Sequence, residues 1–209
     1  MTAKPKIPLP PATLVLDEAA DIRHHGGFLF RVYATAGDHP QEWDELREFG
    51  PIPGMRFDPH PSPTGDHPGF GVMYTAPDHI TALAEVYQEE HVIDRDVRGN
   101  ALVIWEPTRE LELLDLTDYW PVRNKGAAAM QMGDKENTPA WAHAIQKQFG
   151  DRVDGLYHRS SVTGQPIITL FERSRGSFPD RPDFNEPLTN AACDELILDA
   201  CDRLGYAAT

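Results

Sequence analysis

The sequence predicts an α+β fold, built as a single mixed domain. Strand-like and helix-like segments are interspersed along the chain without the regular strand–helix–strand rhythm of a doubly wound sheet, and no internal repeat is found. The length of 209 residues and the hydrophobic share of 40% suit one domain with one sizeable core. An aromatic share of 9%, with four Trp, argues against a disordered chain.

The N-terminal part of the chain predicts short helices and a strand, separated by irregular segments rich in Pro and Gly. Residues 1–13 form a Pro-rich extended arm, and residues 17–23 suit a short helix. Residues 28–33 are aromatic and apolar and predict a strand. Residues 41–49 suggest a helical turn that stops at Gly-Pro, and residues 58–71, with four Pro and three Gly, predict a long irregular loop.

The middle of the chain supplies three strands and one helix. Residues 72–76 predict a short strand, and Asp78 is placed to cap a helix over 78–91 whose apolar side chains recur at helical spacing. Residues 101–105 have no polar position and predict a strand buried on both faces, while 111–116 are a further strand candidate.

The C-terminal part predicts two helices and a hairpin-like pair. Residues 121–137 carry no assignment, and Thr138-Pro139 begins a helix ended by Gly150. Strands over 153–157 and 167–171 are joined by a turn containing Gly164. A loop over 173–187 precedes a closing helix over 189–204.

The charge balance and the cysteines limit the class of function. With 33 acidic against 19 basic residues, the net charge of −14 disfavours sequence-independent nucleic-acid binding. No run approaches the ~20 apolar residues that cross a bilayer. Cys193 and Cys201 lie eight residues apart in a helical segment, about 12 Å, which is too far for a disulfide. We therefore expect a cytoplasmic protein that contacts neither nucleic acid nor membrane.

Two arginines are candidates for an anion site. Arg31 is the one charge inside an apolar strand, where a guanidinium needs either an internal carboxylate or a bound anion such as a phosphate. Both alternatives stay open. Arg56 alone would be a surface residue, but together with Arg31 it could complete a local anion site in an otherwise acidic protein.

Helical periodicity places Glu85 about 140° from the apolar stripe of its helix, so that pattern alone indicates a solvated carboxylate. Ser160 and Ser161 lie in a turn between strands, where serine is common. A nucleophilic pair with His158 is not supported, because no Gly-x-Ser-x-Gly motif surrounds either serine.

The histidines and glycines match no standard metal or nucleotide motif. His24 with His25, and His60 with Asp66 and His67, come closest to a ligand cluster, but neither lies in an HExxH or CxxC frame. No GxGxxG follows a strand and no GxxxxGK[ST] is present. We therefore expect no metal site.

Four separated segments resemble the RES-domain family, which is named for an arginine, a glutamate and a serine. The resemblance covers about residues 26–172 and rests on the order and spacing of the segments. They are Phe30-Arg31-Val32-Tyr33, Met55-Arg56-Phe57, Val72 to Ala76 with Ala82-Leu83-Ala84-Glu85, and Asp154 to Ser160 with Ile168 to Phe171.

The resemblance implies a central, mostly antiparallel sheet flanked by helices, similar to the ADP-ribosyltransferase fold. It implies an NAD+-consuming toxin that splits the nicotinamide–ribose bond by hydrolysis or by phosphorolysis, with inorganic phosphate as co-substrate in the second case and no other cofactor. An antitoxin partner with an Xre-like helix-turn-helix domain is also implied. Arg31, Glu85 and Ser160 would be catalytic, and Arg31, Arg56, Tyr74 and Ser160 would bind NAD+.

The resemblance divides the chain into an arm with a short helix (1–25), a RES-like catalytic domain (26–172) and a C-terminal loop and helix packed on it (173–209). The chain also departs from the family pattern. Met55 replaces a glycine, Asp58 places a negative charge beside the expected anion site, and spacing favours Ser160 over Ser161. Two alternatives stand beside NAD+ cleavage: mono-ADP-ribosylation of a protein in the same pocket, and a catalytically silent binding module, which Met55 and Asp58 would favour.

Overall fold

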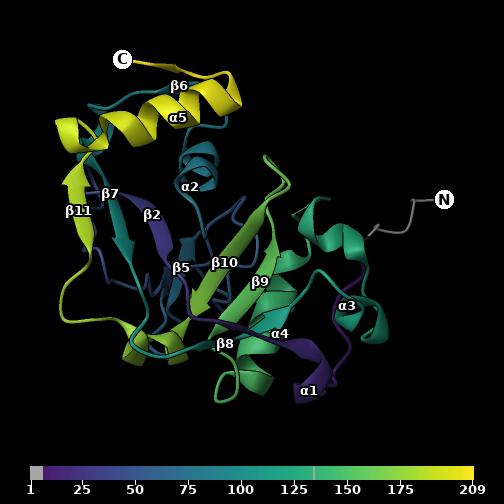
Figure 1. The fold of residues 1–209 in the computed structure, drawn as a ribbon. Helices are drawn as coiled ribbons and strands as arrows, with labels where there is room; N and C mark the ends of the chain where they lie inside the picture. Colours follow the sequence, from purple (N-terminus) through teal and green to yellow (C-terminus); the bar gives the residue numbers. More distant parts are fainter. Residues whose placement is uncertain (1–6, 134) are drawn as a thin grey trace.

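The structure, a computed structural model, describes residues 7–133 and 135–209 (Figure 1). Its larger sheet has five strands in the order β1-β8-β9-β10-β5, and only β8 and β9 are parallel neighbours. The strands are β1 (Ile22–His25), β8 (Leu111–Asp115), β9 (Gly155–Arg159), β10 (Pro166–Phe171) and β5 (Val72–Thr75). The expected mixed fold with a mostly antiparallel sheet is confirmed.

A second, antiparallel sheet has the order β11-β7-β2. Its strands are β11 (Phe184–Pro187), β7 (Asn100–Trp105) and β2 (Leu29–Ala34). An antiparallel bridge between Phe30 and Ala76 ties β2 to the end of β5, so the two sheets meet at this point. Two small pairs complete the strands: β3 (Phe49–Gly50) with β4 (Gly65–Asp66), and β6 (Val92–Ile93) with β12 (Ala207–Ala208).

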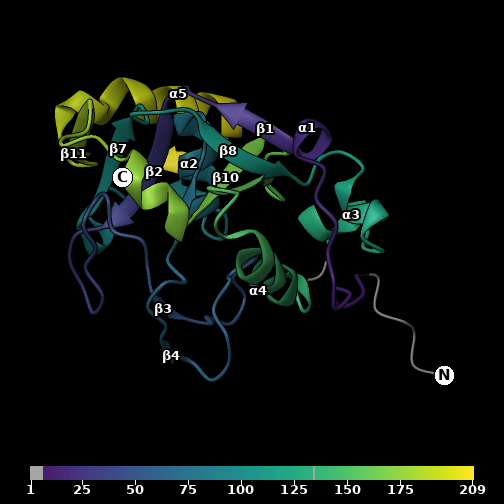
Figure 2. The ribbon, with the colours of Figure 1, turned by 90° about the horizontal axis from the view of Figure 1, so that it is seen from below.

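Helices cover the outer faces of the two sheets, which gives four layers (Figure 2). α4 lies on the five-stranded sheet, the two sheets pack on each other, and α2 with α5 covers the three-stranded sheet. The helices are α1 (Glu18–Asp21), α2 (His79–Val86), α3 (Trp120–Arg123), α4 (Thr138–Phe149) and α5 (Asp194–Leu204), with 3-10 turns at Val97–Gly99, Ala128–Gln131, Glu172–Ser177 and Ala191–Cys193.

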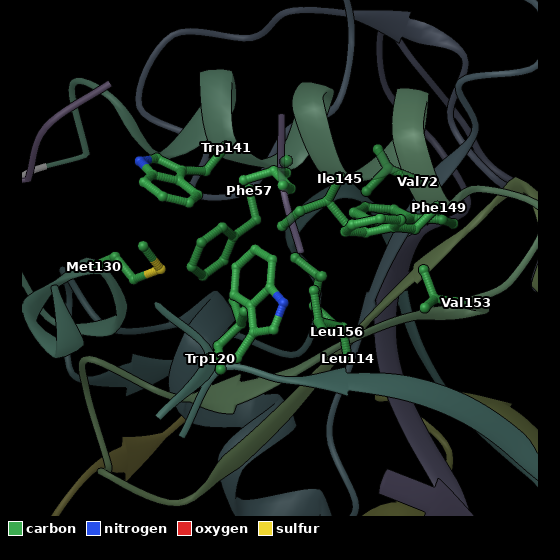
Figure 3. Packing of buried hydrophobic residues seen from close by; sticks show 14 of the residues in the cluster. Phe57, Val72, Leu114, Trp120, Met130, Trp141, Ile145, Phe149, Val153 and Leu156 are labelled. Carbon is green, nitrogen blue, oxygen red and sulfur yellow. The ribbon is translucent and has the colours of Figure 1, made fainter. Parts of the chain in front are cut away.

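The predicted helix over 138–149 is confirmed, and it shows how the layers are held. Trp141, Ile145 and Phe149 recur at four-residue spacing and point from α4 into the core (Figure 3). They meet Leu114 and Leu156, which project from the facing side of the sheet. Burying a side chain of this size stabilises the fold by roughly 1.5–3 kcal/mol.

The N-terminal arm is packed on the same core from residue 7 onward, and residues 1–6 lie outside the described part. Ile7 and Leu14 are buried in the α4 cluster. The indole N–H of Trp120 donates to the carbonyl of Val15 at 2.9 Å, and that of Trp141 donates to Pro8 at 2.7 Å. Because β1 pairs with β8, residues 22–25 belong to the five-stranded sheet.

Several expectations need correction. The helical turn over 41–49 is wrong, because these residues form a turn that enters β3. The helix over 17–23 shortens to Glu18–Asp21, capped by Asp17, and the residues after it enter β1. The helix capped by Asp78 is confirmed but ends at Val86. The loop over 173–187 contains β11, which pairs with β7.

Cys193 and Cys201 are both free, as expected from their helical spacing. None of the helices in the described part of the chain is both long and apolar enough to cross a membrane.

Candidate functional site

A pocket of about 310 Å³ lies where β2, β5, the end of β9 and the last turns of α2 meet. Segments far apart in the sequence therefore line one cavity. The structure brings all of the sequence-predicted site residues to its wall: Arg31, Arg56, Tyr74, Glu85 and Ser160.

A carboxylate–hydroxyl pair lies in this pocket. The Ser160 hydroxyl donates to the Glu85 carboxylate, with 2.5 Å between Oγ and Oε1. Ser160 is only 2% exposed, and its Oγ accepts hydrogen bonds from the backbone N–H groups of Val162 (3.0 Å) and Thr163 (2.9 Å). Because the turn fixes this hydroxyl, its single proton is directed at Glu85.

The Glu85–Ser160 contact shows where two residues lie whose surroundings the sequence left open. Glu85 is not a solvated helix carboxylate, so the interpretation from periodicity is wrong: the polar side of α2 borders the pocket. Of the two serines, it is Ser160 that is buried against Glu85, whereas Ser161 is exposed.

The Arg31 guanidinium is buried and is held by neutral acceptors. Nη1 donates to the carbonyls of Trp43 (3.0 Å), Glu42 (3.2 Å) and Glu45 (3.4 Å), and Nη2 donates to the Gln41 side chain (2.7 Å). No carboxylate in the described ranges lies within ion-pair distance of it, so the internal ion pair is wrong. Burial lowers the Arg31 pKa to about 10, and the group stays a cation at neutral pH.

Arg56 reaches the pocket from the segment before the long loop. Its Nη1 donates to the carbonyls of Met130 (2.8 Å) and Gly133 (3.0 Å), which belong to the connection between β8 and α4. Met55, the residue that replaces a family glycine, also lines the pocket. The connection between β8 and α4 therefore helps to orient Arg56 in the pocket.

Asp58 does not place a free negative charge in the site. Its carboxylate is fully buried and accepts hydrogen bonds from Arg47 Nη2 (3.0 Å), the Ile52 N–H (3.0 Å) and the His60 ring. Burial alone would raise the Asp58 pKa, but the His60 and Ile52 hydrogen bonds and the Arg47 charge outweigh it and lower the pKa to about 2.

Tyr74 lies on β5 with its ring against the α4 core. Its hydroxyl is buried and makes no hydrogen bond of normal geometry to the described residues, although the Arg47 guanidinium lies beside it. Desolvation is the main cause that raises the Tyr74 pKa, so the phenol stays protonated and can donate to a ligand.

His158 also lines the pocket but does not act with a serine. Its Nε2 pairs with Thr169 Oγ1 at 2.9 Å, and its ring packs edge-on against Phe57 at 4.7 Å between centroids. Burial lowers the His158 pKa to about 3, which keeps the imidazole neutral. The His158 ring nitrogens contact Thr169 Oγ1 and the Arg159 carbonyl, and neither pairs with a serine hydroxyl in the described residues.

The pocket is strongly cationic in a chain of net charge −14. The sequence reasoning missed three of its cations: Arg47, Lys135 and Arg159 also line the wall, where Glu85 is the one carboxylate among the described lining residues. No spacing in the sequence distinguishes these cations from surface residues. Among the described residues, no group of three or more His, Cys, Asp or Glu side chains is placed to hold a metal ion.

Comparisons with known proteins bear on the fold and on the family of this chain. A chain of the crystal structure of the M. tuberculosis MbcT–MbcA toxin–antitoxin complex superposes with a TM-score of 0.56 at 16% identity, covering 86% of this chain and 93% of that chain. No curated protein matches the sequence. The family model for the RES domain matches residues 28–190, and therefore extends beyond residue 172 into the C-terminal segment. The chain belongs to the RES domain family.

Proposed function

We propose that this protein cleaves the nicotinamide–ribose bond of NAD+. The observation that carries the proposal is the Glu85–Ser160 pair, a single carboxylate held by a buried hydroxyl in a pocket otherwise rich in cations. Such a site suits a substrate that combines a diphosphate with a reacting centre at which positive charge develops.

The chemistry follows from the charges. Nicotinamide leaves NAD+ as a neutral group, and the electrons of the glycosidic bond leave with it, so the ribosyl carbon becomes oxocarbenium-like. The Glu85 carboxylate stabilises this positive charge, and the hydrogen bond from Ser160 keeps that carboxylate in place. The Arg31 and Arg56 guanidinium groups attract the diphosphate, and the Tyr74 ring packs on the nicotinamide or ribose.

The acceptor of ADP-ribose is either water or inorganic phosphate. The surplus of cations in the pocket favours phosphate as a co-substrate, which would attack the ribosyl carbon and yield ADP-ribose phosphate. Transfer to a protein side chain uses the same pocket and is the second candidate, since two of the residues that line it, Ser161 and Arg159, are exposed. A silent binding module is the third.

The biological role we propose is that of a toxin that depletes NAD+ in the cytoplasm. The similar solved structure is titled as a toxin–antitoxin complex, which supports a partner protein that neutralises this chain. We propose that the partner carries an Xre-like helix-turn-helix domain. Co-expression with the neighbouring open reading frame, followed by co-purification and a growth assay, tests this role.

Incubating purified protein with NAD+, with and without inorganic phosphate, tests the activity. Products are identified by mass. Loss of NAD+ that requires phosphate and yields nicotinamide and ADP-ribose phosphate establishes phosphorolysis, and loss without phosphate establishes hydrolysis. If no NAD+ is consumed, bond cleavage by water or phosphate is refuted, and labelled NAD+ with cell lysate then separates protein ADP-ribosylation from a silent module.

A further inference from the structure

Arg47 lies on the pocket wall, outside the four segments that carry the family resemblance. Its backbone is fixed to β5 by two hydrogen bonds with Val72, from Arg47 N to Val72 O (2.9 Å) and from Val72 N to Arg47 O (3.0 Å). Its side chain is 15% exposed. Arg47 is therefore held rigidly at the edge of the site, although its sequence neighbours form an irregular turn.

A buried ion pair orients this guanidinium. Nη2 donates to Asp58 Oδ2 at 3.0 Å, and Nη1 donates to the carbonyl of Phe49. Asp58 is fully buried; the Ile52 N–H donates to the same oxygen, Oδ2, and the His60 ring contacts the other oxygen, Oδ1. A guanidinium has five N–H donors, so these two hydrogen bonds leave three for the neighbouring Tyr74 hydroxyl and a ligand.

The Tyr74 hydroxyl lies beside Arg47 and gives the second observation. It projects from β5, two residues after the Val72 that pairs with Arg47, and it is buried without a hydrogen bond of normal geometry to the described residues. A buried hydroxyl of this kind is costly unless a ligand or water meets it. A phosphate oxygen placed there would accept from both Arg47 and Tyr74.

We propose that Arg47 and the Tyr74 hydroxyl form an anion subsite for a phosphate group, and that Asp58 is the positioning residue that aims Arg47 into it. Asp58, which departs from the family pattern, would then support anion binding instead of opposing it. The subsite itself does not depend on the proposed function. Its occupant, either the diphosphate of NAD+ or free inorganic phosphate, rests on the proposed function.

Isothermal titration with inorganic pyrophosphate, orthophosphate, NAD+ and nicotinamide riboside tests the subsite. We expect Arg47→Gln to weaken pyrophosphate binding about ten- to a hundred-fold, as for loss of charge-assisted hydrogen bonds. Arg47→Lys keeps the positive charge but loses the paired N–H donors of the guanidinium, so its affinity for pyrophosphate should lie between those of wild type and Arg47→Gln. The control Arg203→Gln removes an arginine that pairs with an aspartate on exposed α5, and should bind like wild type.

The ligands distinguish the two sources of the phosphate. If the subsite takes the diphosphate, Arg47→Gln binds NAD+ more weakly than wild type does. Its affinity for nicotinamide riboside, which lacks phosphate, is then unchanged. If the subsite takes free phosphate, Arg47→Gln binds only orthophosphate and pyrophosphate more weakly than wild type does. The subsite is overturned if wild-type protein binds neither inorganic anion, or if Arg47→Gln and Arg47→Lys bind them as wild type does. Wild-type protein that binds pyrophosphate through Arg47 but neither binds nor consumes NAD+ contradicts the proposed function alone.

Asp58→Asn tests the positioning role through its dependence on Arg47. We expect it to weaken pyrophosphate binding when Arg47 is present, and to have no further effect in the Arg47→Gln background. An equal loss in both backgrounds would show that Asp58 acts only on the fold. Near-ultraviolet circular dichroism identifies variants that fail to fold, and Arg47→Lys, which retains the partner of Asp58, then carries the test.

Discussion

Replacing Glu85 by Gln is the most direct test of the carboxylate's role. The change keeps the side-chain shape and an oxygen that can accept from Ser160 Oγ, now 2.5 Å from Glu85 Oε1. Only the charge is lost, so the hydrogen bond weakens from charge-assisted to neutral and the free energy of unfolding falls by about 1 kcal/mol. The transition state loses the one carboxylate among the described lining residues, which we expect to cost about 3 kcal/mol, or ~100-fold in turnover.

For the same protein preparations, the loss of NAD+ is measured by mass spectrometry and the free energy of unfolding is measured in urea. Glu89→Gln serves as the matched control, because Glu89 is exposed just beyond α2 and does not line the pocket. The control should match wild type in both measurements. Turnover by Glu85→Gln within twofold of wild type would contradict the role of the carboxylate, whatever the stability of the variant.

Four further outcomes are expected. Arg31→Ala should lower the free energy of unfolding by about 2 kcal/mol in urea, because it frees the carbonyls of residues 42–45, and an unchanged midpoint would show that this anchor is unimportant. Leu14→Ala should cost about 2–4 kcal/mol, and a smaller loss would mean that the arm is only loosely attached. The Asp58 pKa of about 2 lies below its usual value of 3.8, so this residue stabilises the fold above pH ~4 and loses that contribution, about 2 kcal/mol, as the pH falls through 2. Asp58→Asn should make the free energy of unfolding depend less on pH in this acid range, and an unchanged dependence would contradict this assignment to Asp58. The His158 pKa of about 3 in the folded protein lies below the ordinary value of 6.5, so on acidification this side chain is protonated in the unfolded chain first. The free energy of unfolding therefore falls as the pH is lowered from 6.5 to 3. An NMR titration that shows His158 in the folded protein titrating near pH 6.5 would contradict this.

The sequence could predict those elements that carry a local pattern. Strand β7, without a polar position, and helix α4, with Trp141, Ile145 and Phe149 at regular spacing, were confirmed. β1 and β11 were missed, because each has few apolar residues and is defined by its neighbour β8 or β7. The turn over 41–49 was mistaken for helix because its conformation is imposed by Arg31, through carbonyls that no sequence pattern marks.

Some residues of the candidate site could also be predicted from the sequence, and others could be found only from the fold. Glu85 and Ser160 were found only through the order of separated motifs, since periodicity places Glu85 in solvent. The turn at Val162 and Thr163 that orients the Ser160 hydroxyl toward it is a tertiary feature. Arg47 lies outside every motif and could not be found without the fold, because its role depends on a buried partner eleven residues away.

The order of strands in the larger sheet also bears on how the protein is made. β5 joins this sheet only through β10, whose Ile168 accepts a hydrogen bond from Thr75 across 93 residues. On a ribosome, the segment that carries Tyr74 therefore emerges long before β10, the strand with which it pairs in this sheet. A nascent or prematurely terminated chain that ends before β10 has no assembled pocket. Any activity of this pocket would thus begin only after the chain has been synthesised through β10 (Pro166–Phe171).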